Sequence, residues 1–163
     1  MTKRYILFDL DGTITDSSEG ITRSVQYALN KLGITEKDQS VLRKYIGPPL
    51  DESFQRFHGL DKETALVAVG YYRERYTDTG LYENRLFGGV DKMLKELKED
   101  GYIVALATCK PEIYVPRILK YFDVAEYFDV AVGSELEGGL RRRKNQVIDE
   151  VFVRLAAAGL ADT

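Results

Sequence analysis

Two acidic residues near the start of the chain, Asp9 and Asp11, have the spacing of a catalytic or metal-binding pair. They directly follow the apolar run 5–8, and Gly12 behind them lets the chain turn so that both acids can point at one small site. Crowded carboxylates repel each other unless a cation neutralises them, and Mg²⁺ is held by one or two carboxylates together with phosphate oxygens of a substrate. A carboxylate can also attack phosphorus to form an aspartyl-phosphate, while a second acid protonates the leaving oxygen and later activates water. The pattern therefore predicts a phosphoryl-transfer site, and the alternative is a strand end followed by a turn, where Asp and Gly are common.

Three apolar runs, at residues 5–8, 103–107 and 128–132, predict the strands that position these acids. Continuous apolar runs are typical of strands buried on both faces, as in a parallel sheet. Ligands of such sheets bind beyond the carboxyl ends of the strands. The first strand ends at Asp9, so the acids are expected at the functional edge of the sheet.

Apolar residues at three-and-four spacing predict helices between the strands. The predicted helices cover about residues 21–32, 50–57, 65–76, 90–97, 115–122 and 147–155. Pro111 suits a first helical position, whereas Pro116 is expected to kink the helix that follows it or to shorten its start. The block 15–86 contains no convincing strand, so the sequence predicts an α/β fold with a helical insertion after the first strand.

Composition excludes several classes of protein. With 163 residues the chain suits one domain, or a small domain with an insertion, and it is long enough to need no disulfide or zinc. The net charge of −3 argues against a nucleic-acid partner, and no apolar run approaches the length of about 20 residues that a membrane-spanning helix needs. We find no secretory signal, and the single cysteine, Cys109, rules out an internal disulfide, so the expected location is cytoplasmic.

The string FDLDGT at residues 8–13 resembles the first motif of the haloacid dehalogenase superfamily, in its phosphoglycolate-phosphatase-like branch. The resemblance implies a Rossmann-like parallel sheet, formed by residues 1–14 and 87–163, with an inserted helical cap domain at 15–86. It implies that Asp9 is the nucleophile and Asp11 the general acid and base. It also implies that Mg²⁺ is bound by the Asp9 carboxylate and the Asp11 backbone carbonyl. The name-giving dehalogenases lack the second acid, so Asp11 favours phosphoryl transfer over dehalogenation.

Two further motifs of the family are matched. Thr108 stands where the family has a Ser or Thr at the end of its second strand, and its hydroxyl can donate to a phosphoryl oxygen beside a helix N-terminus. Its neighbours Cys109 and Lys110 are included in the predicted substrate-binding loop, although the Cys109 thiol itself is expected to pack. Lys144 matches the third motif, in which a cation offsets charge on the nucleophile and the phosphoryl group. Lys144 ends a basic run that begins at Arg141, so a solvated helix start is the alternative, with another residue in that role.

The insertion also resembles the family's cap. Residues 46–50 and 71–84 carry the likeness, and caps of this kind close over the site, exclude water and select the substrate. Arg43 and Gly47 are the residues that we predict to face the substrate. Tyr71, Tyr72 and Tyr76 are expected to pack inside the cap instead.

The likeness ends near residue 151. The family's fourth motif, a pair of acids on a later strand that supplies the remaining Mg²⁺ ligands, has no match before the chain ends at Thr163. We therefore expect weakened Mg²⁺ binding and an exposed edge at residues 5–8, through which two copies can form a dimer. A fragment, a truncated gene product or a strand-swapping variant would each account for this departure.

The lead hypothesis is thus a magnesium-dependent phosphatase that acts on small phosphomonoesters through an aspartyl-phosphate. A phosphomutase of the same fold and a non-catalytic relative that binds phosphate or a partner are the alternatives. Phosphoglycolate, nucleotides, sugar phosphates and pyrophosphate all suit such a site, and the fold does not select among them.

Overall fold

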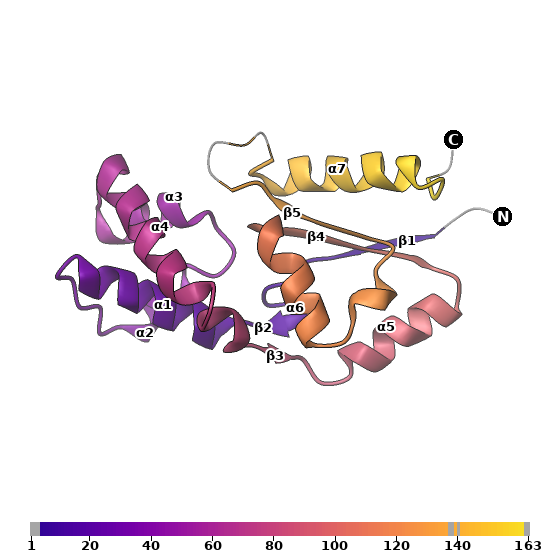
Figure 1. The fold of residues 1–163 in the computed structure, drawn as a ribbon, viewed down its shortest axis with the longest axis horizontal. Helices are drawn as coiled ribbons and strands as arrows, with labels where there is room; N and C mark the ends of the chain where they lie inside the picture. Colours follow the sequence, from indigo (N-terminus) through magenta and orange to yellow (C-terminus); the bar gives the residue numbers. More distant parts are fainter. Residues whose placement is uncertain (1–3, 137–138, 140, 162–163) are drawn as a thin grey trace. The chain divides into compact units, whose positions relative to one another are not determined.

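The chain forms two compact units. A computed structural model describes residues 4–136, 139 and 141–161. The first unit combines residues 1–15 and 86–163, and the second unit is the intervening segment 16–85. The chain leaves the first unit through β2 (Thr15–Asp16) and returns through β3 (Arg85–Leu86), and these two short strands pair with each other (Figure 1).

A parallel sheet is the centre of the first unit. Its strands are β1 (Tyr5–Phe8), β4 (Ile103–Pro111) and β5 (Val130–Ser134), in the order β1-β4-β5. The register pairs Tyr5 with Ile103 and Ala105 with Val130. The α/β class and the parallel sheet are confirmed. Among the described residues β1 is an outer strand, as expected, and the dimer through it stays a prediction.

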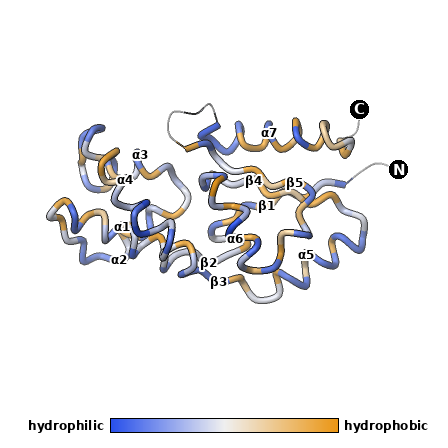
Figure 2. Tube along the Cα trace, in the orientation of Figure 1, coloured by the Kyte–Doolittle hydropathy of each residue, from blue (hydrophilic) through white to orange (hydrophobic). Residues whose placement is uncertain are grey.

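Helices cover both faces of this sheet, which explains the continuous apolar strands. On one face α7 (Lys144–Ala157) packs Val147, Val151 and Leu155 against alternate residues of β4 and β5. The other face is covered by α5 (Val90–Glu99) and α6 (Val115–Tyr121), which Figure 1 shows across the strands from α7. Figure 2 shows β4 as largely hydrophobic, whereas α5 and α7 alternate between hydrophobic and hydrophilic residues.

Of the two prolines, only Pro111 does not lie where we expected it. Pro111 is the last residue of β4 and not the first of a helix, because a register shift after Ala107 carries the strand past Thr108. A proline is tolerated at such an irregularity because it needs no ladder hydrogen bond there. A 3₁₀ turn, η2 (Glu112–Tyr114), then precedes α6, so Pro116 falls in the first turn of that helix. The helix therefore starts late, as expected of Pro116, and it need not kink, since a proline in the first turn removes no helical hydrogen bond.

The second unit is helical. It contains α1 (Ser18–Lys31), α2 (Gln39–Arg43), α3 (Leu50–His58), α4 (Lys62–Tyr76) and the 3₁₀ turn η1 (Gly80–Tyr82). Helix α4 packs against α1 and α3. As predicted, Tyr72 and Tyr76 are buried, with their rings stacked 5.1 Å apart, whereas Tyr71 is only half-buried. None of the helices in the described ranges is long and apolar enough to cross a membrane.

A short connection leads from α6 to β5. The turn η3 (Ala125–Tyr127) ends this crossover and leads into β5. Asp129 lies between η3 and β5. Its carboxylate accepts a hydrogen bond from the Val104 amide at 2.8 Å and forms an ion pair with Lys98 at 2.6 Å. These contacts tie the start of β5 to β4 and α5, at the end of the sheet opposite the two acids of β1.

Candidate functional site

Asp9 lies directly after β1, at the carboxyl end of the sheet. Its Oδ1 accepts a hydrogen bond from the Leu10 amide at 2.8 Å. Its Oδ2 lies 2.7 Å from Nζ of Lys144, the first residue of α7. The same Nζ donates to the Ala107 carbonyl in β4 at 2.9 Å, so Lys144 joins three elements. The fold thus places a lysine ammonium directly beside the carboxylate that we predicted to be the nucleophile.

Asp11 has a lysine of its own. Nζ of Lys110, at the end of β4, lies 3.0 Å from Oδ1 and 2.9 Å from Oδ2 of Asp11. Only 4% of the Lys110 side chain and 10% of the Asp11 side chain are exposed, so this pair is well shielded from water. Sequence reasoning predicted Lys110 as a substrate-binding residue, but it did not predict this pairing.

Thr108 and Cys109 occupy the irregular part of β4. The Thr108 side chain is buried, and its Oγ1 accepts a hydrogen bond from the Lys110 amide at 3.1 Å. Burial raises the pKa of the Cys109 thiol, although the Lys144 charge opposes this shift. The thiol therefore stays protonated at neutral pH and is a poor nucleophile, in agreement with its expected role in packing. The Cys109 carbonyl accepts a hydrogen bond from Oγ of Ser134 in β5 at 2.8 Å.

Arg43 and Gly47 belong to the second unit. Arg43 is exposed at the end of α2, and Gly47 is exposed with a φ of 107° that only glycine adopts readily. Their predicted contact with substrate stays a prediction. The four residues Asp9, Asp11, Thr108 and Lys144, by contrast, are gathered with Lys110 at one end of the sheet in the first unit.

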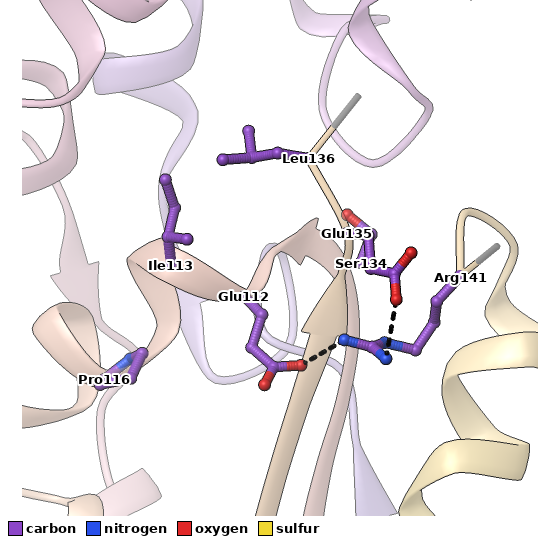
Figure 3. Close-up of a pocket in the computed structure, with 7 residues that line it drawn as sticks. All are labelled: Glu112, Ile113, Pro116, Ser134, Glu135, Leu136 and Arg141. Atoms are coloured by element: carbon purple, nitrogen blue, oxygen red, sulfur yellow. Dashed lines mark hydrogen bonds and ion pairs between the residues drawn. The ribbon is translucent and has the colours of Figure 1, made fainter. Parts of the chain in front are cut away.

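A cluster beside this site was missed by sequence reasoning. A pocket of about 400 Å³ lies at the ends of β4 and β5, and Figure 3 shows its lining residues Glu112, Ile113, Pro116, Ser134, Glu135, Leu136 and Arg141. Glu112 accepts hydrogen bonds from Arg141 and from Arg154, which come from separate segments of the chain. Nothing in the local sequence distinguishes Glu112 from an ordinary surface acid, because its partners are 29 and 42 residues away.

The donor atoms available for Mg²⁺ are hard oxygens, which is the chemistry that this ion prefers. They come from the carboxylate of Asp9, which is paired with Lys144, and from the backbone carbonyl of Asp11, which leaves the Asp11 carboxylate, paired with Lys110, for proton transfer. Within the described part of the chain no three or more His, Cys, Asp and Glu side chains are grouped so that they could hold a metal ion by themselves. The two acids fit an ion that completes its coordination with water and substrate phosphate oxygens.

The fold and the candidate site together indicate the protein family to which the chain belongs. A parallel sheet with helices on both faces carries two acids after its first strand and a lysine at the start of its last described helix. The model of the haloacid dehalogenase-like hydrolase family matches residues 6–153. The chain therefore belongs to the haloacid dehalogenase-like hydrolases, as the FDLDGT string predicted.

Individual relatives differ in their activities. A 5'-nucleotidase of Pseudomonas aeruginosa is 46% identical over 156 residues, which are 96% of this chain and 69% of that protein. The tyrosine-protein kinase PtkA of Mycobacterium tuberculosis is 36% identical over 152 residues, and the match spans 93% of this chain but only 51% of the kinase. The crystal structure of a predicted phosphatase from Clostridium acetobutylicum superposes with a TM-score of 0.89 at 45% identity, covering 96% of this chain and 72% of that one.

Proposed function

We propose that this protein is a magnesium-dependent phosphatase that hydrolyses small phosphomonoesters through an aspartyl-phosphate. The observation that carries the proposal is the Asp9 carboxylate at the carboxyl end of β1, with the Lys144 ammonium 2.7 Å away and Asp11 two residues further on. The phosphatases and the 5'-nucleotidase among the relatives support the same reaction.

In the proposed reaction an Asp9 carboxylate oxygen attacks phosphorus. The new bond joins Asp9 to phosphorus, the bond from phosphorus to the ester oxygen breaks, and that oxygen takes a proton from Asp11. Asp11 then removes a proton from water, which attacks phosphorus and releases inorganic phosphate and the free Asp9 carboxylate. Lys144 offsets negative charge on Asp9 and on the phosphoryl group throughout.

Lys110 and Thr108 are proposed to bind the phosphoryl group. The Thr108 hydroxyl and the amides of Cys109 and Lys110 lie along the irregular end of β4, close to the Asp11–Lys110 pair. We propose that Lys110 moves from the Asp11 carboxylate to a phosphoryl oxygen when substrate enters, which frees Asp11 for proton transfer. An Mg²⁺ ion bound by Asp9 and Asp11 would supply further positive charge for the phosphate oxygens.

The second unit is proposed to act as the cap that selects the substrate, with Arg43 and Gly47 toward the leaving group. Nucleoside 5'-monophosphates are the first substrates to test, because a 5'-nucleotidase is 46% identical over nearly the whole chain. The single cysteine suits the reducing cytoplasm, which we propose as the location.

Hydrolysis of an aryl phosphate with Mg²⁺, and then with excess chelator, tests the proposal. We expect turnover that the chelator abolishes and that Asp9→Asn lowers by about 10³-fold or more, because the amide cannot attack phosphorus. Circular dichroism of Asp9→Asn must match the unchanged protein, so that the loss is chemical. Turnover that survives Asp9→Asn would disprove the aspartyl-phosphate. Phosphate binding without turnover would favour the non-catalytic alternative.

A second candidate is transfer of the phosphoryl group to a hydroxyl other than water. The name of the relative PtkA, a tyrosine-protein kinase, favours it, and the same aspartyl-phosphate could serve as the donor. Hydrolysis in ¹⁸O-labelled water distinguishes the two, because a phosphatase places one labelled oxygen in each phosphate released. A phosphotransferase instead places the phosphoryl group on an added tyrosine peptide.

A further inference from the structure

We propose that Glu112 is a positioning residue that sets the location of Lys144 by joining α7 and the segment before it to the ends of β4 and β5. The inference rests on the proposed function in one respect only, the role of Lys144 in the reaction. The contacts of Glu112 stand independently of that role.

Both carboxylate oxygens of Glu112 are used. Oε1 accepts from Nη1 of Arg154 in α7 at 2.8 Å. Oε2 accepts from Nη2 of Arg154 at 3.2 Å, from Nη2 of Arg141 at 2.9 Å and from the Gly133 amide of β5 at 3.1 Å. Three segments that are distant in sequence therefore meet at one side chain, and Figure 3 shows the Arg141 contact at the base of the pocket.

Arg141 attaches the segment before Lys144 to the end of β5. Its Nε donates to the Gly133 carbonyl at 2.8 Å, and its own carbonyl accepts from the Glu135 amide at 2.9 Å. Residues 135 and 141 are thereby held together at the end of β5. Lys144 follows only three residues later, so the start of α7 is tied to the sheet.

Arg154 supplies the second attachment, on the far side of Lys144. It lies ten residues further along α7, which is about 15 Å of helix. Its Nε is also held by Glu150 at 2.8 Å. The packing of α7 on the sheet leaves small shifts of the helix possible, and attachment both before and after Lys144 restrains these shifts along the helix axis and about it.

The close approach of β5 to Glu112 depends on Gly133. A Cβ at that position would lie 2.6 Å from the Glu112 Cα and 2.5 Å from the Lys110 carbonyl oxygen. Real Cβ atoms do not approach backbone so closely, so any other residue would push the two strand ends apart. The same strand end carries Lys110 and Thr108, and the attachment of α7 is thus built against the proposed site.

The opposite charges of Glu112 and its two arginine partners stabilise the attachment of α7 to the sheet. The side chains of Arg141, Glu112 and Arg154 are 16%, 29% and 35% exposed, so their hydrogen bonds are partly shielded from water. Burial alone would raise the pKa of Glu112, but hydrogen bonds from Arg154 and the Gly133 amide, together with the two arginine charges, lower it. Glu112→Gln keeps the shape of the side chain, removes the negative charge and turns an NH₂ group toward arginine donors.

Hydrogen–deuterium exchange tests the positioning without any need for activity. In Glu112→Gln we expect faster exchange of peptides that cover residues 141–149, with α5 unchanged as the internal reference. Glu126→Gln is the matched control, since Glu126 is an exposed acid on η3, and it should leave both regions unchanged. Unchanged exchange at 141–149 in folded Glu112→Gln, or uniformly faster exchange over the whole first unit, would overturn the proposal.

Kinetics of the phosphatase reaction test the link to Lys144. Glu112→Gln should lower kcat by about 10- to 100-fold with little change in KM, because a catalytic group displaced by about 1 Å costs that much. In a Lys144→Met background the same change should lower kcat no further. An equal loss in both backgrounds would overturn the proposal. If the unchanged protein hydrolyses no phosphate ester, the proposed function fails, and hydrogen exchange alone decides whether Glu112 positions α7.

Discussion

Replacing Lys144 with methionine should damage the reaction far more than the fold. The Lys144–Asp9 pair has an Nζ–Oδ2 distance of 2.7 Å, and 40% and 41% of the two side chains are exposed. At that distance two unit charges in bulk water attract by about 1.5 kcal/mol. Side-chain entropy and salt reduce this further, and exposed pairs contribute about 0.2–1 kcal/mol. Lys144→Met should therefore lower the free energy of unfolding by no more than about 1 kcal/mol.

The effect on catalysis is expected to be larger, because negative charge develops on the transferring phosphoryl group next to the Lys144 ammonium. Removing one preorganised group that stabilises such charge costs about 10²- to 10³-fold in kcat, or roughly 2.7–4 kcal/mol. Urea unfolding measures the first quantity, and aryl phosphate hydrolysis with Mg²⁺ measures the second. The ratio of the two effects is the prediction.

Lys98→Met is the matched control. Nζ of Lys98 lies 2.6 Å from Oδ2 of Asp129, and 30% and 20% of these side chains are exposed. This pair lies where β5 begins, away from Asp9, so its loss should cost at least as much stability and leave kcat unchanged. The reasoning is refuted if Lys144→Met keeps kcat within about threefold of the unchanged protein. It is also refuted if Lys98→Met lowers kcat to the same extent.

Three further predictions concern stability, and urea unfolding checks each of them. Gly133→Ala should cost about 1–3 kcal/mol through its clash with backbone, whereas Gly70→Ala, in the exposed middle of α4 with no atom within 4 Å of the new Cβ, should stabilise by up to about 1 kcal/mol. Leu155→Ala, fully buried under the sheet, should cost about 2–5 kcal/mol, whereas Val153→Ala, 61% exposed on the same helix, should stay within about 0.5 kcal/mol. Hydrogen bonds from the hydroxyl and the amide of Ser18 lower the pKa of Asp16 in the folded protein. The ionised Asp16 carboxylate therefore stabilises the native state at pH values above the pKa that Asp16 has in the unfolded chain. Asp16→Asn should therefore cost about 1 kcal/mol at pH 7, and the deficit should shrink as the pH falls through the lowered pKa. A deficit that does not change with pH on the acid side would contradict this account.

Much of the fold was predictable because it depends on local patterns. The apolar run 5–8 and the run from Ile103 predicted β1 and β4 correctly, since strands covered on both faces require continuous apolar residues. The third strand was found two residues later than expected, at Val130–Ser134. Pro111 was misjudged because a register shift and a 3₁₀ turn separate it from α6, and neither feature has a periodic signal.

In the candidate site, too, the contacts that are local in sequence were predictable and the distant ones were not. Asp9 and Asp11 are two residues apart on one strand end, so their proximity is a property of the chain itself and the sequence by itself determined it. Lys110 meets Asp11 across 99 residues, and Glu112 meets Arg154 across 42. Only tertiary structure decided these pairs, because side chains so distant in sequence meet only when the pairing of β1 with β4 and the packing of α7 on the sheet set their positions.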